Sequence, residues 1–456
     1  MNSAKFNSRL FRLAAIFWTV ASMASAGAQT APRNAPMDFQ GRVLVSISDA
    51  DMLASAYVDG VLGPREGRDA ISVIPLTEGD RVIDVRTLRA YETEVSNSVA
   101  GAPSAVAISP DGRYAFVVET FKQAEQQAQR FSDLPAGMTL TLVDIANPKT
   151  PRVLEKLEVG KRLETVEINP AGDMLAVGLH PRDGRGVAFI PFREGRFGTP
   201  SYQLLPGVDK DTRITHVSWH PSGRFIAAAL SDAGRIAFAR VQRQGDEISL
   251  QPWGGSVQVG KYPFKIVWTP GGKYVLANNL QWGPDVGGFW TEAPRGSVAS
   301  IRFADKSATD LQGRTVVQHA LVGVAETGVS PEGLTISPDG QLVVTTNLER
   351  SFLPYDDSRI TWHASLSLLR FDLASGQLQH VADYPFDGIL PESAVFDNSS
   401  RYLAVANFDH FDDNRAGGSI DFWRVDRDPL NPHPLLVRTV HNVPVTRGPH
   451  SIVLAR

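Results

Sequence analysis

The chain has 456 residues, a formal net charge of −4 and no cysteine. Its length allows several domains or one large all-β domain, and its 39 glycines and 30 prolines predict many turns. The mild acidity lacks the basic footprint of a nucleic-acid-binding protein. The absence of cysteine excludes disulfides, thiolate-bound metals and covalently attached c-type haem.

The first residues have the pattern of a targeting segment. Lys5, Arg9 and Arg12 precede an apolar run from Leu13 to Met23, and small residues follow up to Ala28. This pattern predicts a secretory signal peptide over residues 1–28 and a short linker over 29–36. The alternative is an uncleaved anchor, but the run is shorter than the roughly 20 residues that span a bilayer. We therefore expect a periplasmic or secreted protein with no membrane span and no lipid anchor.

A repeat begins beyond this segment. The stretch "SAVAISPDGRYAFVVE", from Ser104, joins two alternating apolar runs through Pro110-Asp111-Gly112, which predicts a strand, a tight turn and a second strand. Proline presets the turn, and glycine supplies the left-handed conformation that the turn requires. Related copies recur at similar intervals along the chain, with starts at Ser104, Glu164, Thr215, Phe264, Glu332 and Glu392.

Two further strands follow each hairpin, for example Met138–Ile145 and Arg152–Val159 in the copy that begins at Ser104. Four antiparallel strands at this period describe a blade of a β-propeller. Gly41–Asp49 matches a second strand that lacks a first, and His450–Arg456 matches a first strand that lacks a second. The sequence thus predicts a seven-bladed propeller over 37–456, closed by the C-terminal strand in the N-terminal blade. Six or eight blades are the alternatives.

The turns "SPDGRYAFVVE" and "SPDGQLVVTTN" resemble the repeat of the YVTN family of β-propellers, which includes lactonase-like and cytochrome d1-like members. The resemblance covers essentially the whole mature chain and implies the propeller fold. It leaves function open, since the family includes enzymes, electron-transfer partners and binding proteins.

The topology predicts where a site should lie. The Pro-x-Gly turns fall on one face of the ring, so the opposite face, called the top here, carries the longer loops and the mouth of the central channel. The residues that start the first strands should line this mouth, and they are Ser104, Glu164, Thr215, Phe264, Glu332, Glu392 and His450. Among them Glu332, Glu392 and His450 are candidate catalytic acids and bases. The alternative is that each glutamate only accepts backbone N–H bonds.

A divalent cation such as Ca²⁺ is a second possibility at this mouth, because carboxylate oxygens are its preferred ligands. Its candidate ligands are Glu332, Glu392 and Asp409, the last in the acidic loop Asp409–Asn414. That loop lacks EF-hand spacing, and a solvated acidic loop is the alternative.

Long top loops are expected in blades two, five, six and seven, and long loops on a compact repeat are usually functional. Their aromatic content predicts either stacking surfaces for a ligand or mutual packing, and a pocket displaced toward blades five to seven. The candidate ligand-binding residues are Arg162, Glu164, Trp282, Trp290, Arg350, Tyr355, Trp362, Asn407 and Arg447.

Two functions remain in competition. The first hypothesis is a monomeric binding module that holds a protein or a small molecule on its top face. The second is a lactonase-like hydrolase with a glutamate–histidine acid–base pair, in which an arginine holds a carboxylate or phosphate of the substrate. A Ca²⁺-dependent, six-bladed lactonase is disfavoured by the seven repeats.

Overall fold

The computed structural model describes residues 32–97, 104–412, 415–427 and 433–456. The chain divides into two units, Met1–Pro32 and Arg33–Arg456, and the second unit carries the fold. The predicted signal peptide lies outside the described residues.

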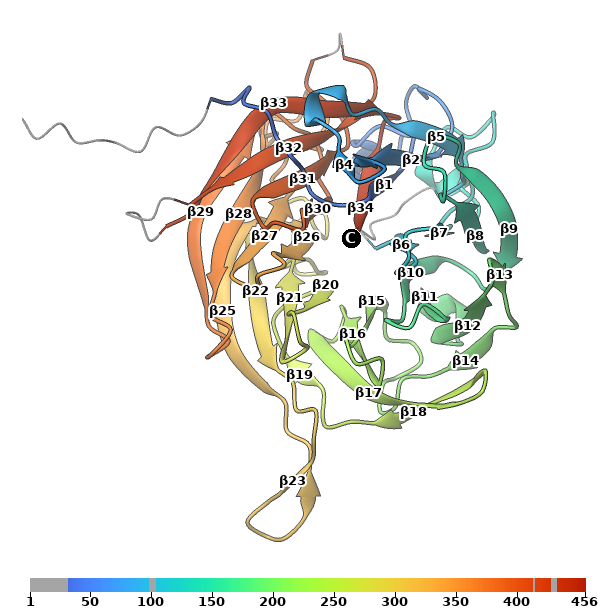
Figure 1. Ribbon diagram of the computed structural model, residues 1–456, viewed down its shortest axis with the longest axis vertical. Coiled ribbons are helices and arrows are strands. Elements are labelled where there is room, and N and C mark those ends of the chain that lie inside the picture. Colours follow the sequence, from blue (N-terminus) through green and yellow to red (C-terminus); the bar gives the residue numbers. More distant parts are fainter. Residues whose placement is uncertain (1–31, 98–103, 413–414, 428–432) are drawn as a thin grey trace, which may run out of the picture. The chain divides into compact units, whose positions relative to one another are not determined.

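Seven antiparallel sheets are arranged in a ring around a common axis in the unit Arg33–Arg456 (Figure 1). The order of strands from this axis outward confirms the predicted seven-bladed, all-β propeller. Blade one consists of β34 (Pro449–Ala455), β1 (Val43–Ser48), β2 (Ala70–Pro75) and β5 (Tyr91–Glu94), and blade two of β6 (Val106–Ile108), β7 (Tyr114–Val118), β8 (Thr139–Asp144) and β9 (Arg152–Glu158). Blade three consists of β10 (Leu163–Ile168), β11 (Met174–Leu179), β12 (Val187–Arg193), β13 (Arg196–Phe197) and β14 (Ser201–Gln203). Blade four consists of β15 (Ile214–Trp219), β16 (Phe225–Leu230), β17 (Arg235–Gln244), β18 (Glu247–Pro252) and β19 (Val257–Gln258).

Blades five to seven repeat the same order. Blade five consists of β20 (Pro263–Trp268), β21 (Tyr274–Asn279), β22 (Arg295–Arg302) and β25 (Ala320–Val329). Blade six consists of β26 (Pro331–Ile336), β27 (Leu342–Asn347), β28 (Ala364–Phe371) and β29 (Leu378–Phe386). Blade seven consists of β30 (Ser393–Phe396), β31 (Tyr402–Asn407), β32 (Gly418–Asp426) and β33 (Leu435–Val445).

The remaining elements are short. They are the helix α1 (Ala56–Asp59), three 3-10 turns (Val85–Thr87, Phe131–Asp133 and Pro181–Asp183), and two small hairpins, β3 (Thr77–Glu78) with β4 (Arg81–Val82) and β23 (Ala308–Thr309) with β24 (Thr315–Val316). The second hairpin projects away from the ring (Figure 1). A search of the described part of the chain finds no helix with the length and hydropathy needed to cross a membrane.

The ring closes as predicted. Strand β34, from the C-terminus, pairs with β1 of the N-terminal blade, with Leu454 opposite Leu44 and Ile452 opposite Ser46. The hydroxyl of Ser46 also donates to the carbonyl of Ser451 at 2.9 Å. Closure satisfies the exposed backbone groups that two open blades would otherwise present to other chains.

The repeated turns have the expected backbone. Gly112 adopts φ 65°, and its N–H donates to the carbonyl of Ser109 at 2.7 Å. Glycines occupy this left-handed position in five of the six copies, and Ser400, with φ 59°, occupies it in the last. Glycine is favoured because it has no Cβ to clash in this region.

The core lies between neighbouring blades. Side chains on the two faces of each sheet alternate into adjacent blades, so that Phe116 of blade two meets Phe192 of blade three at a ring-centroid distance of 4.8 Å. Both faces of the sheets are covered in this way, and buried polar side chains such as Ser46 and Ser72 also lie within the strands. Several innermost strands carry further buried polar residues near their top ends, among them Glu164, Thr215, Glu332 and His450.

Candidate functional site

A β-bulge lies at the top of most innermost strands. In β26, Pro331 pairs with Asn347 and Gly333 with Thr346, so Glu332 between them has no partner in the ladder. The same shift occurs at Glu164, Thr215 and His450. A bulge turns the extra side chain out of the regular alternation. Bulges therefore aim these four of the residues predicted to line the mouth, whereas Glu392 precedes the paired part of β30.

A second backbone feature recurs at the start of the innermost strands. The residue two positions before the mouth residue is left-handed in five blades: Arg162 (φ 54°), Tyr262 (56°), Ser330 (51°), Leu390 (50°) and Gly448 (84°). Left-handed conformations of non-glycine residues cost about 1 kcal/mol or more each and persist where the surroundings impose them. The chain thus accepts local strain to set the direction of the mouth side chains.

Two carboxyl groups lie together on one side of the mouth. Glu332 and Glu392 are only 3% and 2% exposed and line the same cavity of about 220 Å³. Burial raises the pKa of Glu332 to about 8. Burial also raises the pKa of Glu392 well above its usual value, and the charges of Glu332 and Asp49 raise it further. The two groups behave as a coupled pair that holds protons at neutral pH.

A phenol stands above this pair. Tyr57 on α1 lines the same cavity, and its pKa is raised by burial and by nearby Asp49, Glu392 and Glu332. It is a neutral hydroxyl at any physiological pH. It can donate or accept a hydrogen bond but adds no charge.

Guanidinium groups gather around a buried glutamate on another part of the mouth. Arg213, which also lines the cavity, donates from Nη2 to Glu164 at 3.1 Å and from Nη1 to the Tyr262 hydroxyl at 2.9 Å. Arg162 lies 3.9 Å from the same carboxylate and 4.7 Å from the ring centroid of Phe121. Glu164 is thus an ion-pair partner of both arginines, with the shorter contact to Arg213, and its single negative charge is shared between them. The Nε atom of Arg213 is buried and has no hydrogen-bond partner among the described residues.

Aromatic rings from four connecting segments form the upper wall of the cavity. The rings that line it are Tyr57, Phe131, Tyr262, Trp282, Phe289 and Trp290. Neighbouring rings are in contact, as between Trp282 and Trp290 at a centroid distance of 5.2 Å and between Tyr262 and Phe289 at 5.6 Å. We call these six residues the aromatic collar. Mutual packing and a lining role therefore occur together, the two alternatives that the sequence left open.

Phe289 belongs to the aromatic residues that the long loops were expected to contribute. Four other residues at this mouth were not predicted from the sequence, namely Tyr57, Phe131, Arg213 and Tyr262. Arg213 stands two residues before Thr215, as Arg162 stands two residues before Glu164, so the repeat register contained the signal. Tyr57 lies in the loop between β1 and β2. This loop is also long, so its length could have marked it as functional in the same way as the other long loops. Because this loop and the Phe131 loop contribute, the cavity also extends to blades one and two, beyond the predicted blades five to seven.

His450 faces a different partner. Its Nε2 is 2.8 Å from Oδ1 of Asn97, whose amide donates to the carbonyls of Ser48 and Val95. This network makes Nε2 the protonated nitrogen. Burial lowers the pKa of His450 to about 3, so the imidazole is neutral at physiological pH. His450 does not line the cavity of Glu332 and Glu392.

Three further candidate residues hold loops in place. Arg350 donates to the carbonyls of Thr291 and Ala293 in the blade-five loop. Arg447 donates to the carbonyls of Ala50 and Pro64 and lies 3.3 Å from Glu66. Asn407 accepts from the N–H of Ile389 at 3.1 Å. These contacts fix the three side chains, and Arg447 also lines a cavity of about 480 Å³ together with Tyr355 and Asp409.

The other predicted aromatic residues separate into two groups. Trp282 and Trp290 belong to the collar, and Trp282 Nε1 donates to the Ser330 hydroxyl at 2.9 Å. Tyr355 and Trp362 lie on the outer rim, 51% and 56% exposed, at a centroid distance of 5.4 Å from each other. They do not line the cavity of the glutamate pair.

One acidic group could hold a divalent cation. Single carboxylate oxygens of Asp49, Asp51 and Asp69 lie within 4.8 Å of one another, and all three residues are buried. All three carboxylates also accept backbone N–H bonds, Asp49 from Asp51, Asp69 from Ala50 and Asp51 from Ala124. Within the described ranges, the predicted set of Glu332, Glu392 and Asp409 forms no such converging group. Part of the acidic loop after Asp409, residues 413–414, lies outside the described residues.

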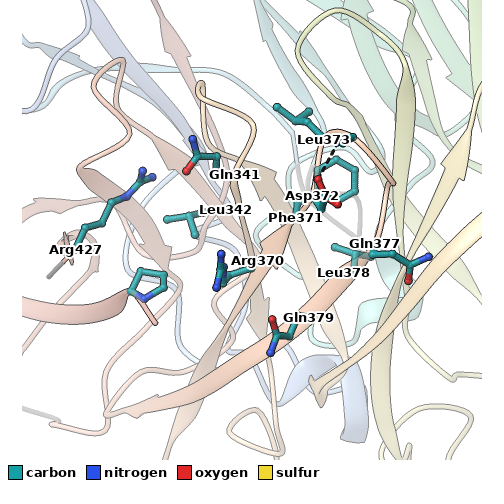
Figure 2. A pocket seen from close by; sticks show the side chains of 12 residues that line it. Gln341, Leu342, Arg370, Phe371, Asp372, Leu373, Gln377, Leu378, Gln379 and Arg427 are labelled. Carbon is teal, nitrogen blue, oxygen red and sulfur yellow. Dashed lines mark hydrogen bonds between the residues drawn. The ribbon is translucent and has the colours of Figure 1, made fainter. Parts of the chain in front are cut away.

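A larger cavity, of about 680 Å³, lies at the hairpin-turn end of blade six (Figure 2). Its polar side chains are engaged locally. Asp372 accepts from the N–H of Ala374 and the hydroxyl of Ser375, and Arg427 lies 2.7 Å from Asp339. The mouth is the better candidate because it combines a cavity with two buried, protonated carboxyl groups.

No family model and no curated protein matches the sequence. Solved structures do match the fold. One is a Bacteroides uniformis protein described as a candidate 6-phosphogluconolactonase, with 15% identity, coverage of 91% of this chain and 99% of that chain, and a TM-score of 0.59. Another is the periplasmic gluconolactonase of Pseudomonas aeruginosa, with 15% identity, coverage of 91% and 99%, and a TM-score of 0.54. A Desulfotomaculum acetoxidans protein of unknown function matches at 12% identity, with coverage of 91% and 99% and a TM-score of 0.55. The chain is thus a seven-bladed β-propeller, as its YVTN-like repeats predict, and it shares its fold with structures named as lactonases.

Proposed function

We propose that the chain hydrolyses a lactone at the channel mouth, with Glu332 and Glu392 as its acid–base pair. The observation that carries the proposal is the burial of two coupled carboxyl groups on the wall of one cavity. Buried acids with raised pKa values are typical of general acid–base sites, because they hold or accept a proton near neutral pH.

The chemistry follows from the coupled titration. When the pair has lost one proton, the ionised carboxylate removes a proton from a water molecule, and the water oxygen attacks the lactone carbonyl carbon. Collapse of the tetrahedral intermediate breaks the bond to the ring oxygen. The carboxyl group that kept its proton donates it to the departing alkoxide, and the product is the open hydroxy acid.

Arg213 has a position suited to the developing oxyanion. It lines the cavity and is fixed by Glu164 and Tyr262, so its guanidinium is preorganised. Fixed donors stabilise transition-state charge because no reorganisation is needed during the reaction. His450, neutral and bonded to Asn97, has no proton-transfer role in this scheme, and two glutamates replace the predicted glutamate–histidine pair.

Two further points support the proposal. Proteins with the same fold include one named as a periplasmic gluconolactonase and one described as a candidate 6-phosphogluconolactonase. Residues 1–28 have a signal-peptide pattern, and we accordingly propose that the protein acts in the periplasm or outside the cell.

The alternative is a binding module without chemistry. The aromatic collar favours it, since six rings around a small cavity provide a stacking surface for a ligand. In that case the buried glutamates would serve only as neutral hydrogen-bonding groups.

The test uses purified protein and a panel of γ-butyrolactone, δ-valerolactone, glucono-δ-lactone and dihydrocoumarin, with proton release followed by a pH indicator. We expect hydrolysis of at least one lactone, and loss of at least 100-fold of kcat in both Glu332→Gln and Glu392→Gln. Glu158→Gln, at an exposed glutamate of β9, is the matched control and should keep full activity. Hydrolysis that survives in the Glu332→Gln, Glu392→Gln double variant would refute the assignment.

A further inference from the structure

Phe289 is the most unusual residue of the aromatic collar. Its backbone is left-handed, with φ 67°, and its side chain is 41% exposed. A bulky side chain at positive φ is strained, and an exposed ring gains little from burial. Folding alone therefore does not account for a phenylalanine at this position. Strained residues that persist on the surface cluster at binding sites.

The position of Phe289 connects it to the glutamate pair. Its ring packs edge-on against Tyr262 at 5.6 Å, and the Tyr262 hydroxyl accepts from Arg213. Phe289, Tyr262 and Trp282 line both the mouth cavity and a neighbouring groove of about 580 Å³. The three rings thus form the wall between the two spaces, with Phe289 at its exposed edge.

The cations that line the two spaces have carboxylate partners. Arg213 in the cavity pairs with Glu164 at 3.1 Å, and Lys261 in the groove pairs with Asp285 at 2.5 Å. Arg162, which shares the carboxylate of Glu164 at 3.9 Å, lines neither space, and the groove carries a further acid, Asp232. An anionic ligand such as a sugar phosphate would have to displace these partners or approach the carboxyl groups of the pair. Recognition of phosphate ordinarily uses uncompensated arginine or lysine side chains. The cavity instead offers aromatic faces and neutral groups.

We propose that the lactone taken by this site is uncharged and fused to, or substituted by, an aromatic ring that stacks on Phe289. This inference rests on the hydrolase function proposed above and specifies its substrate class. Phe289 acts as a specificity-determining residue, and the glutamate pair carries out the proton transfers. Aromatic pairs in proteins prefer offset-stacked or edge-to-face contacts over a direct face-to-face sandwich, a geometry that the half-exposed ring of Phe289 leaves available.

The test compares two lactones that share the same six-membered ring. Dihydrocoumarin carries a fused benzene ring and δ-valerolactone does not. Dihydrocoumarin is also intrinsically more reactive, because its leaving group is a phenoxide. The aromatic contribution is therefore read from the change in the ratio of the two kcat/KM values between variant and wild type, in which the intrinsic reactivities cancel. We expect Phe289→Ala to lower this ratio about fivefold, and Phe289→Tyr to restore it. Tyr91→Ala, at a half-buried ring on the outer strand β5, is the control and should leave the ratio unchanged. Melting temperatures of all variants verify that the fold is intact.

The outcomes separate the two proposals. If both lactones are hydrolysed and Phe289→Ala leaves the ratio unchanged, the aromatic inference is overturned while the hydrolase function stands. A higher kcat/KM for 6-phosphogluconolactone than for dihydrocoumarin would likewise overturn the aromatic inference and leave the hydrolase function standing. If no lactone is hydrolysed, the hydrolase function fails, and calorimetric titration with coumarin and with 6-phosphogluconate then decides the inference alone. Coumarin binding that weakens in Phe289→Ala supports it, and tighter binding of 6-phosphogluconate, or no coumarin binding, overturns it.

Discussion

Glu332 makes the stability of the propeller depend on pH. Its folded-state pKa of about 8 lies above its ordinary value of 4.5, because burial disfavours the charged carboxylate. The folded chain therefore keeps a proton that the unfolded chain releases. The retained proton contributes to the free energy of unfolding. This stabilisation is fully present below pH 4.5, falls by about 1.4 kcal/mol for each pH unit above it, and is lost once the pH has passed 8. Its full size is about 5 kcal/mol.

Glu332→Gln removes this titration while keeping the size and the neutral state of the side chain. We expect the variant and the wild type to have the same stability near pH 4.5. As the pH rises, the variant should become increasingly more stable than the wild type. Unfolding entropy is about 2 cal/mol/K per residue, so about 5 kcal/mol corresponds to roughly 5 °C in the melting temperature of a propeller of this length.

The assay is thermal unfolding by differential scanning fluorimetry at pH 5, 6, 7, 8 and 9, at constant ionic strength. The difference between variant and wild type should grow steadily over this range. Glu158→Gln, at an exposed position on β9, should run parallel to the wild type. If the melting-temperature difference for Glu332→Gln stays constant from pH 5 to 9, the reasoning about the buried carboxyl is wrong.

Three other predictions concern activity and the backbone. Lactone hydrolysis should increase with pH toward about 8, as the coupled pair of Glu332 loses its first proton, and a profile that is flat from pH 5 to 9 would exclude the pair as the base. Gly448→Ala should lower the melting temperature by several degrees, because φ is 84° and a Cβ would lie 2.0 Å from the carbonyl of Asp49; Gly67→Ala, with open space around it, should have no effect. The amide of Asn278 donates to the backbone carbonyl of Glu332 at 2.8 Å. Asn278→Ala should therefore lower the free energy of unfolding in urea by about 2 kcal/mol and lower kcat more than it raises KM. An unchanged kcat would show that Asn278 does not position the glutamate.

The repeat made the architecture predictable from the sequence. Each "SPDG"-type turn joins two short alternating runs, and this local pattern specifies a hairpin whose apolar faces must be covered by neighbours. Closure of the ring also followed from the sequence, because Gly41–Asp49 lacked an inner strand and His450–Arg456 supplied one. Local patterns of this kind survive folding because the tertiary structure uses them in every blade.

The ring of mouth residues was predicted, but their partners were not. Glu332 and Glu392 belong to successive repeats and stand far apart in the chain, and their coupling depends on the local backbone that aims both carboxyl groups into one cavity. His450 occupies the same register, yet its imidazole meets Asn97, which enters from the end of the first blade. Bulges and left-handed residues shift side chains by one position, and no hydropathy pattern records such a shift.

The sequence by itself determined the number of blades, the face on which the loops gather, and the residues that start each inner strand, because these follow from a local repeat. Only the tertiary structure decided which of those residues share a cavity, which arginines pair with Glu164, and which rings form the collar. Those outcomes depend on burial and on charges brought together from distant blades. Both change the pKa of a side chain, and neither is encoded within any single repeat.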